Sequence, residues 1–211
     1  MSMVSIQKPE KVFQYFEKIC SIPHGSRNVE KISNYLVSFA KEHGLKYRQD
    51  EKYNVIIWKD GSTGYEQSEP LIIQGHMDMV CEKRPDVEHD FTKDGLNLSV
   101  EGDYVSANGT TLGGDDGIAV AYALAILDDD SLAHPPIEAV FTVDEEIGML
   151  GADYMDASDL KGRLFLNIDS ELCRWCDGSL HDSGKEGRCR GQCDPHFSQR
   201  FPRRTFRCGD Q

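Results

Sequence analysis

The sequence has few features of a secreted or membrane protein. Its first residues, MSMVSIQKPEKVFQYFEKI, lack the basic start, apolar run and small-residue cleavage site of a secretory signal. No stretch approaches the roughly 18 apolar residues of a membrane-spanning helix. Cysteine is scarce over most of the chain, because only Cys20 and Cys81 precede residue 172. Two isolated thiols are typical of a reducing compartment, so we expect a cytoplasmic protein with no membrane partner.

Positive charge is also scarce. The 211 residues include 23 lysines and arginines against 36 aspartates and glutamates, which gives a formal net charge of -13. Proteins bind nucleic acids and anionic membranes by neutralising phosphates with cationic side chains. The composition therefore argues against nucleic acid as a partner and favours small molecules or metal ions.

The composition changes abruptly at residue 172. Residues 172–211 contain five of the seven cysteines and eight of the 23 cationic residues, but no Ile, Val, Ala, Met or Tyr. Because a core cannot be built from such residues, we interpret 1–171 as a partial domain and 172–211 as an out-of-frame or unstructured tail. Two alternatives remain open for the tail, a disordered basic segment and a four-cysteine zinc module. The module would use Cys173, Cys176, Cys189 and Cys193.

Helices and strands are predicted to alternate in the first 171 residues. The predicted helices cover residues 11–19, 28–42 and 117–129, and the predicted strands cover residues 54–59, 71–74, 137–143 and 164–168. The second helix is expected to begin with Asn28 as its N-cap and to end at Gly44. Apolar strands that alternate with helices are typical of the α/β class. We therefore expect a mixed sheet with helices on both faces.

Acidic side chains and one histidine lie at the ends of the predicted strands. Three strands are followed by His76 and Asp78, by Glu145 and Glu146, and by Asp169, while a glycine-rich turn supplies Asp115 and Asp116. Ligands of open α/β sheets bind beyond the carboxyl ends of the strands, so these side chains are expected to converge. Crowded carboxylates raise each other's pKa values, and divalent cations remove that penalty. The pattern indicates a metal site, for zinc or for manganese or cobalt.

Each of these signals also has an ordinary structural explanation. An H-x-D sequence after a strand or a Glu-Glu pair is more often structural than catalytic, and Asp115-Asp116 can cap a helix. Asp144 is interpreted as a surface acid. The metal hypothesis therefore depends on the common placement of the acids. No G-x-S-x-G elbow, phosphate loop or dinucleotide fingerprint is present in the sequence to support another chemistry.

Four segments carry a resemblance to a known family. They are QGHMDMV (74–80), TTLGGDDGIAVA (110–121), TVDEEIGMLGA (142–152) and NIDSE (167–171). Their order and spacing resemble the M20 metallopeptidase family, and within it the dipeptidases, over about residues 8–171. The resemblance implies a zinc aminopeptidase-like catalytic domain and the hydrolysis of dipeptides by a water molecule that bridges two divalent ions, preferably Zn²⁺, with Mn²⁺ or Co²⁺ also compatible.

The resemblance also implies a role for each matched residue. Four would be metal ligands: His76 and Asp169 on one ion, Glu146 on the other, and Asp115 between the two. Asp78 would orient His76, and Glu145 would be the general base that takes a proton from the water and passes it to the leaving amine. The peptide bond between Asp115 and Asp116 would be cis.

Members of this family are more than twice as long as this chain. Full-length relatives add a lid domain and a later histidine that binds metal, and a homodimer is compatible with the resemblance. In this chain, His181 and His196 lie in no motif that matches that histidine. We therefore expect the chain as given to be incomplete, without the lid domain, and inactive. The alternative hypothesis is a non-catalytic truncated product, or a metal-binding module with a four-cysteine zinc tail.

Overall fold

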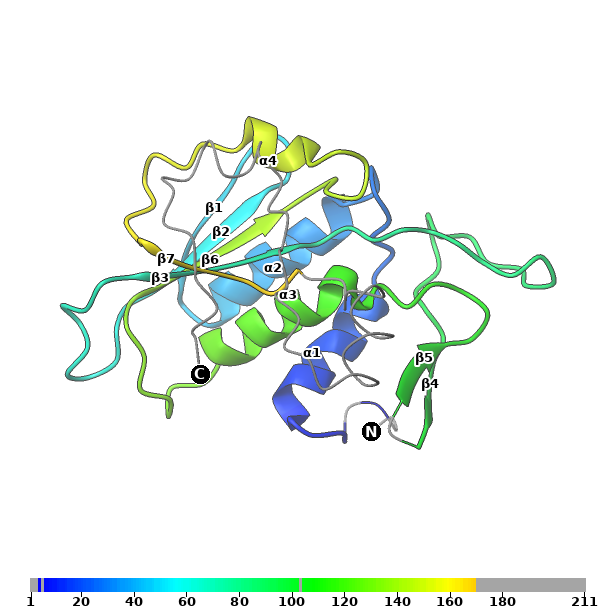
Figure 1. Ribbon diagram of the computed structural model, residues 1–211, viewed down its shortest axis with the longest axis horizontal. Coiled ribbons are helices and arrows are strands. Elements are labelled where there is room, and N and C mark those ends of the chain that lie inside the picture. Colours follow the sequence, from blue (N-terminus) through cyan, green and yellow to red (C-terminus); the bar gives the residue numbers. More distant parts are fainter. Residues whose placement is uncertain (1–3, 5, 103, 170–211) are drawn as a thin grey trace, which may run out of the picture.

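The computed structural model describes residue 4, residues 6–102 and residues 104–169. Five strands form one mixed sheet in the order β1-β2-β6-β3-β7, and two more form a separate hairpin, β4-β5 (Figure 1). The sheet strands are Lys46–Gln49 (β1), Val55–Lys59 (β2), Leu71–His76 (β3), Ile137–Thr142 (β6) and Leu164–Asn167 (β7), and the hairpin strands are Leu98–Glu101 (β4) and Tyr104–Ala107 (β5). The expected mixed α/β fold is confirmed. The predictions for residues 172–211, including the cysteine module, lie outside the described residues.

Strand direction brings three loops to one edge of the sheet. β3 runs parallel to both β6 and β7, with His76 opposite Thr142 and Gln74 opposite Asn167. β2 lies between β1 and β6 and is antiparallel to both. Because β3, β6 and β7 share one direction, the segments that follow them all leave from the same edge.

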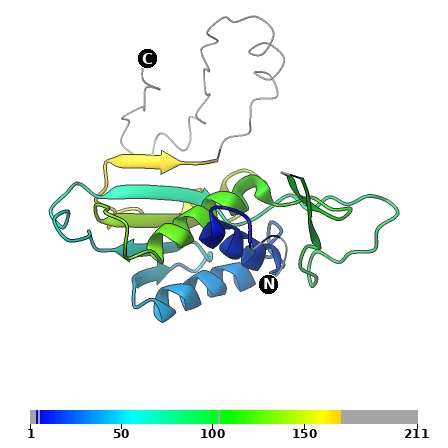
Figure 2. The same ribbon diagram turned by 90° about the horizontal axis from the view of Figure 1, so that it is seen from below.

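Three helices cover one face of the sheet (Figure 2). They are α1 (Glu10–Cys20), α2 (Glu30–Glu42) and α3 (Gly114–Leu127). Their apolar stripes form the main core with the sheet, in which Ile32, Leu36 and Leu124 are completely buried. Each such side chain contributes about 1.5–3 kcal/mol of burial free energy. Among the helices that the structure describes, none is long and apolar enough to span a membrane.

The opposite face of the sheet has a smaller apolar cluster. Ile56, Ile72 and Val140 are buried there under Met155, which directly follows the short helix α4 (Leu150–Tyr154). Trp58, Leu160 and Phe165 pack around this cluster. The two apolar faces of the central strands explain why their sequences are continuous hydrophobic runs.

Most predicted boundaries are displaced by one to three residues, and two of these differences have a clear physical cause. Asn28 is not the N-cap of α2, which begins at Glu30 with Val29 in the capping position and no side-chain cap. The Asn28 amide instead donates to the carbonyl of Phe91 at 3.3 Å, so a tertiary contact uses its hydrogen-bonding capacity. β3 continues to His76, because the backbone of this residue still pairs with β6. Gly44 ends α2 as predicted, with a φ of 65°.

Candidate metal centre

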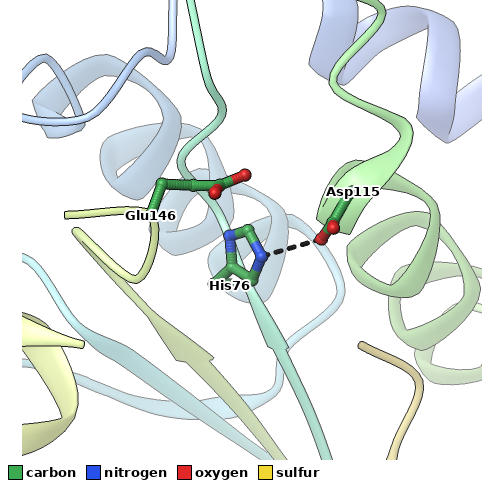
Figure 3. Close-up of side chains that lie close together, drawn as sticks. All are labelled: His76, Asp115 and Glu146. Atoms are coloured by element: carbon green, nitrogen blue, oxygen red, sulfur yellow. Dashed lines mark hydrogen bonds and ion pairs between the residues drawn. The ribbon is translucent and has the colours of Figure 1, made fainter. Parts of the chain in front are cut away.

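A histidine and two carboxylates meet at the carboxyl edge of the sheet. His76 is the last residue of β3, Glu146 lies in the loop after β6, and Asp115 lies in the first turn of α3 (Figure 3). One potential ligand atom from each of the three lies within 4.8 Å of the other two. An imidazole nitrogen and two carboxylate oxygens this close together form a donor set that suits a divalent metal ion.

The imidazole of His76 has a different partner at each nitrogen. Nε2 lies 3.0 Å from Oδ1 of Asp115, and Nδ1 lies 3.0 Å from the backbone oxygen of Asp78. Oδ1 of Asp78 is also 3.4 Å from Nδ1. With a proton on Nδ1, the imidazole donates a hydrogen bond to Asp78, and the lone pair of Nε2 faces Asp115. This is the orientation in which Nε2 can bind a metal ion.

Asp78 connects three segments of the chain. Its Oδ1 accepts the backbone N–H of Glu145 at 3.0 Å, and its Oδ2 accepts the Ser26 hydroxyl at 2.8 Å and the N–H of Glu146 at 3.4 Å. Burial alone raises the pKa of Asp78, but hydrogen bonds from His76, Glu145 and Ser26 outweigh it, and the pKa is lowered. Asp78 is therefore an anion that holds both His76 and the Glu145-Glu146 backbone.

The beginning of α3 has a distorted backbone. Asp115 and Asp116 depart from helical φ and ψ angles, and the peptide bond between them is cis, as the resemblance implied. Asp116 is 2% exposed and accepts the backbone N–H of His76 at 3.1 Å. A Cβ atom on Gly75 would lie 2.8 Å from Oδ2 of Asp116, so this close approach of β3 and α3 requires glycine.

Glu145 and Asp169 lie beside the three clustered residues. Oε2 of Glu145 is 3.9 Å from Nε2 of His76. Burial raises the pKa of Glu145, while the charge of His76 opposes this rise and the charges of Asp169 and Glu146 add to it. Asp169 and Glu145 line one open cavity of about 290 Å³. Asp169 is outside the group of three whose ligand atoms approach within 4.8 Å.

The site has an excess of negative charge. Burial by itself lowers the pKa of His76, but hydrogen bonds with Asp115 and Asp78 and the charge of Asp116 reverse this and raise it to about 11. Without another cation, the acids hold a proton on the imidazole. A divalent ion would replace that proton and neutralise the carboxylates, so the residues present fit a bound metal.

Comparison with known proteins shows the family to which the chain belongs. The family described as peptidase family M20/M25/M40 matches residues 72–189, which is more than half of the chain. The chain is therefore a member of the M20 peptidases.

The most informative relatives are dipeptidases. The cytosol non-specific dipeptidase of Escherichia coli (strain K12) is 42% identical over 171 residues, which cover 81% of this chain and 35% of the relative. The crystal structure of aminoacylhistidine dipeptidase from Vibrio alginolyticus matches with a TM-score of 0.78 and 44% identity, again over 81% of this chain and 35% of the other. A tripeptidase from Staphylococcus aureus, at 24% identity and a TM-score of 0.64, supports the fold alone. The chain thus spans about a third of the length of the two dipeptidases.

Two contributors to the site were not predicted from the sequence. Ser26 had no assigned role, yet its hydroxyl contacts Asp78. Asp144 was interpreted as a surface acid, but it is half-buried and its Oδ1 accepts the backbone N–H of Arg27 at 2.6 Å. These contacts join residues 52 and 117 positions apart, and no local sequence pattern indicates them.

Proposed function

We propose that this chain carries the metal-binding part of a dipeptidase that hydrolyses unblocked dipeptides, Xaa-His dipeptides included, with two divalent ions. The observation that carries the proposal is the convergence of His76, Asp115 and Glu146 at one edge of the sheet. The relatives named as dipeptidases support the substrate class. We further propose a cytosolic location, in line with the name of the Escherichia coli relative.

The proposed ligands divide between two ions. His76 and Asp169 would hold one, Glu146 would hold the other, and Asp115 would bridge them. The position of Asp115 supports this role, since its Oδ1 lies 3.0 Å from Nε2 of His76. Zn²⁺ is the preferred ion for a set with one imidazole, while the many carboxylates also suit Mn²⁺ or Co²⁺. Two bound ions would polarise the scissile carbonyl and acidify a water molecule.

Glu145 is the proposed general base. Its side chain is 28% exposed, so it can reach both the site and the substrate. Burial and the neighbouring acids raise the pKa of its carboxylate, which strengthens it as a proton acceptor. It would accept the proton of the attacking water and pass it to the amine of the departing amino acid. Asp78 assists by binding the backbone N–H of Glu145.

Two measurements test this function. The first is calorimetric titration of the purified chain with Zn²⁺, for which we expect at least one bound ion. The second is a chimera of the Escherichia coli dipeptidase in which its 171-residue matched segment is replaced by that of this chain. We expect metal-dependent cleavage of dipeptides and no cleavage of N-acetylated dipeptides. A folded chimera that binds metal without cleaving dipeptides, beside an active parent enzyme, would contradict the proposal.

A further inference from the structure

The loop between α1 and α2 reaches the metal centre. Gly25 forms a β-bridge with Met79, and the backbone N–H of Ser26 bonds to the carbonyl of Met79 at 3.4 Å. The next residue, Arg27, donates its N–H to Asp144 at 2.6 Å. One short loop therefore contacts both the segment after β3 and the segment after β6, from which the proposed ligands and base extend.

We propose that Ser26 is a positioning residue for the metal centre and acts through Asp78. The inference rests on the proposed metal site. It assigns to the Ser26 hydroxyl the task of fixing the Asp78 carboxylate, which in turn sets the orientation of His76 and the position of the Glu145-Glu146 backbone.

The hydrogen bonds of Asp78 explain why this hydroxyl matters. Oδ2 has two donors, the Ser26 hydroxyl at 2.8 Å and the more distant Glu146 N–H at 3.4 Å. Oδ1 faces His76 and Glu145. The two oxygens belong to one planar group, so anchoring Oδ2 also fixes Oδ1. Asp78 is only 1% exposed, and water therefore has little access to replace a deleted hydroxyl.

The backbone around Ser26 holds the hydroxyl in place. The N–H of Asn28 bonds to the carbonyl of Gly25 at 2.8 Å and closes a tight turn. A Cβ atom on Gly25 would overlap the sulfur of Cys81, so the loop lies directly against the chain beyond Asp78. The turn is flanked by Cys20 and Val29, which are buried in the main core. Ser26 is thus a fixed donor rather than a freely rotating surface hydroxyl.

The inference is tested by titrating the metal-free chain with Co²⁺ and recording its visible absorption, which reports ligand geometry. For Ser26→Ala we expect a dissociation constant about 5- to 30-fold higher and an altered spectrum, because one hydrogen bond to a buried charge is lost. Ser26→Thr keeps the hydroxyl and should stay within about 3-fold of the unsubstituted chain. Ser26→Val has the same shape as Thr without the hydroxyl and should behave like Ser26→Ala, which preserves the test if the alanine variant does not fold.

A matched control separates this role from general stability. Ser38 on the exposed face of α2 donates its hydroxyl to the carbonyl of Asn34 at 2.9 Å, a local contact of the same chemical type. Ser38→Ala should bind Co²⁺ with unchanged affinity and spectrum. Asp78→Ala supplies the second control: it removes the group that accepts the Ser26 hydroxyl, so if Ser26 acts through Asp78, adding Ser26→Ala to Asp78→Ala should change the affinity by less than about 2-fold.

The outcomes separate this inference from the function on which it depends. Unchanged cobalt affinity and spectrum in both Ser26→Ala and Ser26→Val would overturn the role of Ser26 and leave the metal site intact. A full, additive loss on the Asp78→Ala background would overturn action through Asp78. Failure of the unsubstituted chain to bind Co²⁺ would overturn the proposed metal site itself, and the role of Ser26 with it.

Discussion

The two ends of α3 both carry acidic side chains, but only one end has a lysine that pairs with them. At the C-terminal end, Asp128 pairs with Lys11 at 2.8 Å and with His43 at 3.0 Å. At the N-terminal end, Asp115 and Asp116 lie among further acids, and His76 is the one basic group in direct contact among the described residues.

The pKa directions show the consequence of this difference. Burial raises the pKa of Asp128, but hydrogen bonds from Lys11 and Tyr15 outweigh it, and the pKa is lowered. Burial raises the pKa of Asp116 to about 7 despite the nearby charge of His76. Acids that the protein compensates itself stabilise the fold, whereas uncompensated acids form a site for an external cation. The comparison predicts separable effects of substitutions at the two ends.

The largest effect is expected for Glu145→Gln in the dipeptidase chimera. The substitution removes the proposed proton acceptor and keeps a side chain of the same shape, so kcat should fall about 10²- to 10⁴-fold. Zinc content, measured by atomic emission, should stay at the value of the unsubstituted chimera. A rate within a factor of three of that chimera would eliminate Glu145 as the base.

Asp115→Asn tests the uncompensated end directly. The amide removes one negative charge from the proposed bridging position, and we expect affinity for Zn²⁺ to fall about 100-fold or more. Removing a group that only hydrogen-bonds to a metal ligand already lowers metal affinity about 10- to 100-fold. Thermal unfolding of the metal-free chain should change little, because the Asp115 side chain is 47% exposed and the amide oxygen of Asn can still accept a hydrogen bond from His76. Calorimetric titration gives the affinity, and equal affinity in both proteins would rule out Asp115 as a ligand.

Asp128→Asn makes the same substitution at the compensated end. The pairs with Lys11 and His43 are partly exposed, so their loss should lower the free energy of unfolding by only about 0.5–1.5 kcal/mol after allowance for solvent screening. Zinc affinity should be unchanged. Urea unfolding of the metal-free protein measures the loss, and a variant that weakens zinc binding instead would remove the distinction between the two ends.

The smallest effect concerns pH. Because the pKa of Asp128 is lowered in the folded state, its contribution is complete above the unfolded value of about 4 and is lost as pH falls through the lower folded value. The difference in unfolding free energy between the unsubstituted chain and Asp128→Asn should therefore be constant from pH 7 to pH 5 and shrink below about pH 4. Urea unfolding at several pH values, without metal, checks this. A difference that grows as the solution becomes more acidic would contradict it.

Much of the fold was predictable because its signals are local. The apolar pattern after Gly117 predicted α3, and the apolar runs of β2, β3 and β6 predicted central strands. β1 was not predicted, since KYRQ has no apolar run and becomes a strand only through pairing with β2. The assignment of Asn28 as a helix cap failed for a related reason, because the same side chain binds a carbonyl 63 residues away.

The sequence by itself determined which side chains could bind a metal and that some of them lie at strand ends. His76 and Glu146 were named from motif order and strand position, Asp115 was named from a glycine-rich turn, and the structure brings the three together. Only the tertiary structure decided how these groups are held and which acids stay uncompensated. The bonds from Ser26 and Glu145 to Asp78 cross 52 and 67 positions of sequence, and Lys11 reaches Asp128 from 117 positions away. Hydrogen bonds and ion pairs between such distant residues depend on the packing of separate elements, which leaves no periodic pattern along the chain.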